Sequence, residues 1–210
     1  MGIDSQIPYR QKVIEMNNIM KMTESLATEF MQRCNTRSDI NEHLPTLKTF
    51  TEQCDHVTAM GVGTNPDRGT ISTFAFLAGL PKTLIAIDHK QAADLEQMTD
   101  VAKENGIDFK FHQADTTQIE IEETELLFID TLHSYRQLKE ELRLHGNKAT
   151  KYLIFHDIVL FANNNEDNDE PIDGKVGILP AINEFLESND HWEIQSIYQN
   201  NNGLLVMKRV

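Results

Sequence analysis

The sequence of 210 residues predicts an α/β protein with a seven-stranded, mostly parallel sheet, closed by an antiparallel C-terminal hairpin and covered by helices on both faces. Two observations predict this fold class. Apolar segments of strand length alternate with segments of helical periodicity, a pattern typical of parallel sheets with right-handed crossovers. Near the C-terminus, two apolar segments are joined by the turn sequence Asn200-Asn201-Asn202-Gly203. A connection this short joins only antiparallel neighbours.

The elements follow in order along the chain. Apolar residues recur at helical spacing from Tyr9 to about Arg33, and Pro45 favours a second helix that runs to about Gln53. Strands are expected at 56–62, 83–88, 108–112, 125–130, 151–156, 192–198 and 203–208. Helices are expected between most of them, at 69–79, 90–105, 134–145 and 177–188. We therefore predict an N-terminal helical addition over residues 1–54 and one compact sheet domain over residues 55–210.

The composition argues against two kinds of partner. A net charge of -14 and a pI near 4.9 would repel a phosphate backbone, so we expect no nucleic acid. No apolar run reaches the roughly 20 residues that cross a bilayer, and the polar N-terminus lacks a signal-peptide core. Cys34 and Cys54 have no zinc-type spacing and are expected to be reduced thiols. These features predict a cytoplasmic protein without a membrane partner.

A glycine turn directly after the first expected strand is a candidate binding feature. Gly61, Gly63 and Thr64 follow that strand and precede an expected helix, which is how α/β sheets place backbone N–H groups near a nucleotide. The NAD-type pattern would need glycine at position 66, where the chain has Pro66. An NAD-dependent oxidoreductase is therefore disfavoured.

Acidic residues follow the next two strands at the edge where open α/β sheets bind ligands. Asp88-His89 ends the second strand, and Asp88 is suited to accept hydrogen bonds from both hydroxyls of a ribose. Asp115 follows the third strand and is placed to accept from an adenine amine, although an Asp in a loop also serves as a turn residue.

The fourth and fifth strands end in a denser group of polar side chains. Asp130 ends one strand and Asp157 ends the next, so two carboxylates converge in a way that suits a divalent cation. His156 is a candidate imidazole ligand, which favours manganese or iron over magnesium. His133 follows Asp130 by three residues and is a candidate base for a substrate hydroxyl. The alternative is that both acids cap helices or brace loops without metal.

At these residues the sequence resembles class I S-adenosylmethionine-dependent methyltransferases. More narrowly, it resembles the small-molecule and sugar O-methyltransferases grouped with the cephalosporin hydroxylase-like proteins. The resemblance spans residues 40–210 and rests on Gly61-Val62-Gly63, Phe128-Ile129-Asp130-x-x-His133-Ser134-Tyr135 and His156-Asp157-Ile158. Such enzymes usually have an acid before the first glycine, where this chain has Met60.

The resemblance implies a Rossmann-like fold and methyl transfer from S-adenosylmethionine to a hydroxyl of a small molecule or sugar. In metal-dependent members, positions that match Asp130 and the pair His156-Asp157 hold magnesium, and the position that matches His133 supplies the base. Whether this chain needs a cation, Mg²⁺ or Mn²⁺, is left open. The cofactor-binding residues are then expected to be Gly61, Gly63, Thr64, Asp88, His89, Asp115 and Asp130.

An acidic, asparagine-rich segment from Phe161 to Gly177 follows the fifth strand. Its composition predicts a mobile loop over the binding edge, either a lid or a solvated spacer. Two functions stay open at this point: the methyltransferase, and a non-catalytic cofactor-binding or partner-docking module on the same fold. A homodimer that uses the N-terminal helices is a further expectation.

Overall fold

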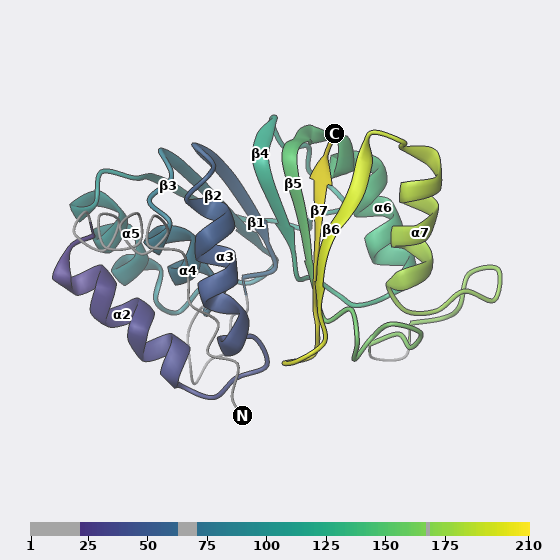
Figure 1. Cartoon of the computed structure of the whole chain (residues 1–210), viewed down its shortest axis with the longest axis horizontal. Coiled ribbons are helices and arrows are strands. Elements are labelled where there is room, and N and C mark those ends of the chain that lie inside the picture. The colour runs from purple at the N-terminus through teal and green to yellow at the C-terminus, as the bar shows by residue number, and fades with distance from the viewer. Residues whose placement is uncertain (1–21, 63–70, 167–168) are drawn as a thin grey trace, which may run out of the picture.

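The computed structural model describes residues 22–62, 71–166 and 169–210, which form one seven-stranded sheet with helices on both faces (Figure 1). The strand order is β3-β2-β1-β4-β5-β7-β6. The strands are β1 (His56–Met60), β2 (Thr83–Asp88), β3 (Asp108–Gln113), β4 (Thr124–Ile129), β5 (Ala149–His156), β6 (Trp192–Tyr198) and β7 (Leu204–Arg209). All seven predicted strands are present, with ends that differ by at most two residues.

The described helices also lie where the periodicity predicts them. They are α2 (Glu24–Asn35), α3 (Leu44–Thr51), α4 (Ser72–Ala78), α5 (Leu95–Glu104), α6 (Tyr135–His145) and α7 (Leu179–Ser188), with short 3₁₀ turns η1 (Asn41–His43) and η2 (Gly146–Lys148). The largest difference is at α5, which was expected from residue 90. Because the carboxylate of Asp88 accepts the backbone N–H of Lys90, at 2.9 Å, the chain turns there before the helix begins. The first part of the expected helix 9–33 and the start of 69–79 lie outside the described residues.

The pairing of the strands confirms the predicted mixed sheet. β1 pairs in parallel with β2 and β4, β2 pairs in parallel with β3, and β4 pairs in parallel with β5. β7 runs antiparallel to both β5 and β6. In the connecting turn, Asn201, Asn202 and Gly203 all have positive φ, which asparagine and glycine adopt more readily than other residues. Parallel pairing aligns the carboxyl ends of β1, β2, β4 and β5 along one edge of the sheet.

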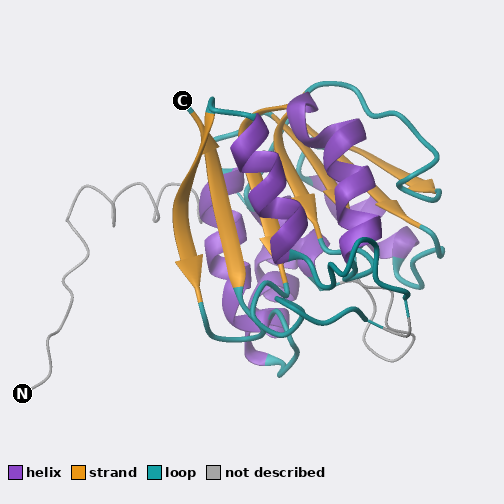
Figure 2. Ribbon diagram, turned by 90° about the vertical axis from the view of Figure 1, so that its right-hand side faces the viewer, coloured by secondary structure: helices purple, strands orange, loops and turns teal. Residues whose placement is uncertain are grey.

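Two apolar cores lie on opposite faces of this sheet. Strand residues point alternately to the two faces, so Phe128 joins the core under α2, α3, α4 and α5, whereas Ile129 joins the core under α6 and α7. Figure 2 shows α6 and α7 in front of the strands. Because the central strands are buried on both sides, they are continuous apolar runs in the sequence. None of the described helices has the length and apolar character of a membrane span.

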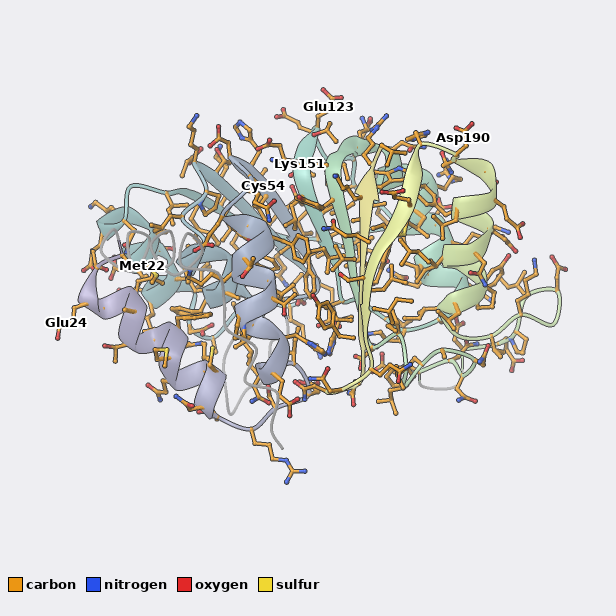
Figure 3. The ribbon with its side chains drawn as sticks, in the orientation of Figure 1. Met22, Glu24, Cys54, Glu123, Lys151 and Asp190 are labelled. Atoms are coloured by element: carbon orange, nitrogen blue, oxygen red, sulfur yellow. The ribbon has the colours of Figure 1, made fainter. Side chains whose placement is uncertain are left out.

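The helix α2 shares the first of these cores. Leu26 and Phe30 are buried within it, while Glu24 points away from the body of the protein (Figure 3). The hydroxyl of Thr23 accepts the N–H of Leu26 and caps the helix, and the side chain of Asn105 bonds to Thr23 from the end of α5. The described N-terminal helices therefore contribute to the packing of the sheet domain.

This packing is testable at two positions of α2. Leu26 is fully buried and Met31 is 55% exposed on the same helix. We expect Leu26→Ala to lower the free energy of unfolding by about 2–5 kcal/mol, because it leaves a cavity in the core. Met31→Ala should change it by about 0.5 kcal/mol or less. Urea denaturation measures both, and equal effects would contradict the packing of α2 described above.

Candidate functional site

The turn after β1 lies directly against the start of the loop after β4. The N–H of Gly61 donates to the carbonyl of Ile87, and the N–H of Asp130 donates to the carbonyl of Met60, both at 2.9 Å. Gly61 has a φ of +69°, and a Cβ at this position would overlap the carbonyl group of Asp130. Met60 is fully buried in the core under α6 and α7, so its side chain takes no part in the site. Gly63 and Thr64 lie outside the described residues.

Asp88 lies at the end of β2, beside this turn. Its side chain is buried and accepts the backbone N–H of Val62, at 3.2 Å, and that of Lys90. Nδ1 of the exposed His89 lies 3.1 Å from Oδ1 of Asp88, the oxygen that also accepts the N–H of Lys90. A carboxylate has about four acceptor positions, so Asp88 still has capacity for a ligand hydroxyl. The predicted pair Asp88-His89 is thus brought next to Gly61.

Asp115 has a local structural role in the described chain. Its exposed carboxylate accepts the backbone N–H of Thr117, at 2.8 Å, and the hydroxyl of the same residue, at 2.7 Å. This is an Asx turn, the alternative role that the sequence left open. Its predicted contact with an adenine amine stays a prediction.

Four charged side chains meet where β4 and β5 end: Asp130, His133, His156 and Asp157, here called the histidine–aspartate cluster. Nε2 of His133 lies 3.1 Å from Oδ1 of Asp130 and 3.1 Å from Oδ2 of Asp157. Nδ1 of His156 lies 3.3 Å and 3.4 Å from the same two oxygens. One ligand atom each from Asp130, His156 and Asp157 falls within 4.8 Å of the others. The structure therefore brings the predicted metal residues together with the predicted base.

The charges in this cluster compensate one another. Burial alone would lower the pKa of His133, but the hydrogen bond and charge of Asp130, with Asp157 and Glu166, raise it to about 9. Burial likewise opposes the charge of His156, yet Asp130 and Asp157 raise its pKa to about 11. Burial would raise the pKa of Asp130, but the two histidines hold it well below its usual range. These contacts favour the protonated form of both rings.

The ring nitrogens that face away from the cluster are also bonded. Nε2 of His156 lies 3.2 Å from the carbonyl oxygens of both Asp39 and Asn201. Nδ1 of His133 lies 2.7 Å from Oε2 of Glu166, and the His133 ring stacks on Phe161 with its centroid at 4.7 Å. These contacts were not predicted. The acidic composition of residues 163–170 marked a loop over the site, but no spacing identified Glu166 within it.

The segment after β5 is folded onto the cluster. The N–H of Glu166 donates to the carbonyl of His133, at 2.9 Å, and the N–H of His133 donates to the carboxylate of Glu166, at 3.2 Å. Asn165 accepts the backbone N–H of Gly177, at 2.7 Å. The segment therefore covers the predicted edge, where it limits the exposure of the His133 side chain to 12%. A small pocket beside the cluster is lined by Ile129, Thr131, Leu132, His133, Leu138, Phe155, His156 and Ile178.

Another buried carboxylate, that of Glu141 on α6, connects two loops of this edge. It accepts from the hydroxyl of Thr131, at 2.8 Å, in the loop after β4, and from the hydroxyl of Thr116 in the loop after β3. Gln137 adds an amide donor at 2.8 Å. Burial raises the pKa of Glu141 although these bonds oppose it. Sequence reasoning missed this residue, because a Glu in an amphipathic helix ordinarily faces solvent.

Comparisons with known proteins bear on the fold. No family model matches the sequence, and no curated protein matches it. The structure is similar to an O-methyltransferase from Bacillus cereus in complex with SAH, with 13% identity, a TM-score of 0.54 and coverage of 99% of this chain and 94% of that one. It is similar to a SAH-bound methyltransferase from Podospora anserina, with 10% identity, a TM-score of 0.53 and coverage of 99% and 100%.

A third similar structure is a SAM-bound amino pentose methyltransferase from Micromonospora echinaspora, with 10% identity, a TM-score of 0.51 and coverage of 88% and 97%. The similarities extend over nearly the whole length of each chain. The protein thus has the fold of class I S-adenosylmethionine-dependent methyltransferases, and the predicted Rossmann-like fold class is confirmed.

The contact between the turn after β1 and Asp130 is testable with two glycines. Gly61 and Gly106 both have positive φ, but a Cβ at Gly106 would meet no atom within 4 Å. We expect Gly106→Ala to lower the free energy of unfolding by about 1–2 kcal/mol, the cost of left-handed backbone. Gly61→Ala should cost more, because the methyl group overlaps the carbonyl of Asp130. Denaturant titrations compare the two, and an equal loss would show that the described contact is not close.

Proposed function

We propose that the protein is an S-adenosylmethionine-dependent methyltransferase that methylates a hydroxyl group of a small molecule or sugar. The observation that carries this proposal is the placement of Asp88 and the histidine–aspartate cluster on either side of the Gly61 turn. This turn ends a central strand of a methyltransferase fold. The side chains that we assign to a nucleoside and to an acceptor therefore lie on one edge of the sheet.

The cofactor side is formed by the ends of β1 and β2. Asp88 would accept the ribose hydroxyls, and the backbone at Gly61 would approach the cofactor closely. Gly63, Thr64, His89, Asp115 and Asp130 complete the cofactor-binding set that we propose from the sequence. When bound, S-adenosylmethionine supplies a methyl group on a sulfonium, which is already a strong electrophile. The protein has to orient the acceptor oxygen and manage its proton.

The acceptor side is formed by the ends of β4 and β5. A small pocket with a largely apolar lining lies beside His133 and His156 on this side. Two of the similar structures are described as an O-methyltransferase and an amino pentose methyltransferase, which supports a small hydroxylated acceptor. The net charge of -14 argues against nucleic acid as the acceptor.

The cluster offers donor atoms for the divalent cation that the resemblance implies. Oδ1 of Asp157 is buried without a hydrogen-bond partner, which favours a cation in its vicinity. Asp130, His156 and Asp157 would hold that cation. The imidazole of His156 in this donor set fits Mg²⁺ poorly, since Mg²⁺ prefers oxygen ligands, whereas it suits Mn²⁺ and its transition-metal neighbours.

His133 is our candidate for the group that takes the proton of the acceptor hydroxyl. A base needs a ring nitrogen with a free lone pair near the acceptor. The ring of His133 contacts carboxylates through both nitrogens, so its role as base requires that one contact be exchanged for the acceptor. Asp130, which holds Nε2 of this ring, would anchor or orient the same hydroxyl.

Binding of SAH to the full chain, measured by calorimetry, tests the cofactor side. We expect Asp88→Ala to weaken SAH at least about tenfold, because it removes the acceptor for the ribose and the bond to Val62. Asp108→Ala, in the exposed side chain at the start of β3, is the control and should leave binding unchanged. Absence of SAH binding by the unaltered protein would refute the proposal.

Transfer of labelled methyl groups from S-adenosylmethionine to a panel of hydroxylated small molecules and sugars tests the acceptor side. His133→Ala and Asp130→Asn should each lower kcat by about 100-fold or more, the usual contribution of general acid–base groups, and His133→Ala should leave SAH binding unchanged. Undiminished turnover in both variants would remove this mechanism. SAH binding with no methylated product from any acceptor would favour the binding module.

A further inference from the structure

The fully buried carboxylate of Glu141 is hydrogen-bonded to uncharged groups in the described part of the chain. Oε1 accepts from the hydroxyl of Thr116 and from the amide of Gln137, the latter at 2.8 Å. Oε2 accepts from the hydroxyl of Thr131, at 2.8 Å. Burial of a carboxylate on such partners is costly, and an apolar side chain of similar size would avoid that cost. The acid is therefore better explained by the groups that it holds than by stability.

The two threonines come from loops to which the proposed function assigns different ligands. Thr116 directly follows Asp115, on the adenine side, and Thr131 directly follows Asp130, on the acceptor side. Their hydroxyls bond to different oxygens of one carboxylate. Because a carboxylate is a rigid planar group, the two hydroxyls are kept at a set separation. Glu141 thus links the loop after β3 to the loop after β4.

A second side chain of α6 holds Thr116 by its backbone. Nε2 of His145, about one helical turn after Glu141, lies 2.7 Å from the carbonyl oxygen of Thr116, so Nε2 carries the proton. The ring is fully buried, and Nδ1 has no hydrogen-bond partner, which is costly. Burial lowers the pKa of His145, in agreement with a neutral ring. Thr116 is therefore fixed to α6 through both its hydroxyl and its carbonyl.

We propose that Glu141 is a positioning residue, which holds the loop after β3 and the loop after β4 at a fixed separation and so sets the distance between nucleoside and acceptor oxygen. The inference rests on the proposed function for the identity of the two ligands, and it adds a residue that would contact neither. Methyl transfer needs the acceptor oxygen in line with the sulfonium carbon, and a displacement of about 1 Å can lower the rate about 100-fold. The other explanation is that Glu141 serves the fold alone.

Effects that cross from one loop to the other separate these explanations. Thr116→Val and Thr131→Val each remove one hydroxyl and keep a branched side chain. We expect Thr116→Val to lower kcat about threefold or more at saturating S-adenosylmethionine, although it alters the adenine side. Thr131→Val should weaken SAH about threefold or more in calorimetry. Both effects should appear together in Glu141→Leu, and neither threonine variant should add to them in that background.

Two further variants distinguish positioning from packing. Glu141→Gln should retain most of the activity that Glu141→Leu loses, because its amide can bond to both hydroxyls. Glu140→Gln is the matched control on the same helix, since the carboxylate of Glu140 pairs with Arg143 at the surface, and it should change neither kcat nor SAH affinity. If Glu141→Leu does not fold, the threonine variants and Glu141→Gln still carry the test.

Amide hydrogen exchange of the ligand-free full chain tests the link without cofactor or acceptor. The N–H groups of Gln118, after β3, and of Asp130, after β4, are both hydrogen-bonded to backbone carbonyls. We expect Thr131→Val to speed exchange at Gln118, and Thr116→Val to speed exchange at Asp130, each about threefold or more. Changes confined to the altered loop, in exchange and in function, would overturn the proposal. A full effect of Thr116→Val in the Glu141→Leu background would also overturn it.

SAH binding by the unaltered protein separates the two proposals. If SAH does not bind, the methyltransferase function fails, and the exchange measurements alone decide whether Glu141 links the loops. If SAH binds and the threonine variants behave like Glu140→Gln, the positioning role fails and the methyltransferase function stands.

Discussion

The burial of opposite charges at the ends of β4 and β5 is the constraint on which the site depends. Asp130 and Asp157 are brought together by the parallel register of neighbouring strands, and unpaired carboxylates at this depth would be costly. The rings of His133 and His156 offset that cost by contacting both carboxylates. His133 lies in the loop after β4, and His156 is the last residue of β5. The loop after β4, the segment after β5 and the turn between β6 and β7 each supply one of these groups or contact one.

The contacts of the cluster extend to segments far from it in sequence. The hairpin turn between β6 and β7 meets the region before α3, where the N–H of Glu42 donates to the side chain of Asn201, at 2.9 Å. Nearby, Nε2 of His43 bonds to the carbonyl of Asn200, at 2.9 Å, and the rings of His43 and His156 meet edge to face. The antiparallel hairpin thus ends the sheet and also supports the ring of His156.

Sequence reasoning predicted the fold almost completely, because buried parallel strands and amphipathic helices have distinct periodicities. It also predicted which residues end the strands, and hence that Asp88, Asp130 and Asp157 share an edge. It did not predict Glu166, because nothing in an acidic loop distinguishes the carboxylate that folds back from those in solvent. Sequence reasoning also could not predict that the backbone carbonyl of Asn201 contacts His156, because every residue carries a carbonyl group and the residue type does not show which one accepts.

The two carbonyls that hold Nε2 of His156 come from opposite parts of the chain, at Asp39 and Asn201. Such long-range contacts form late, because the intervening chain must first be ordered. During synthesis, a chain that ends before residue 201 has every acid of the site but lacks one of the two carbonyls that hold Nε2 of His156. Completion of the C-terminal hairpin therefore adds β7 to the sheet and the second of these carbonyls to the site.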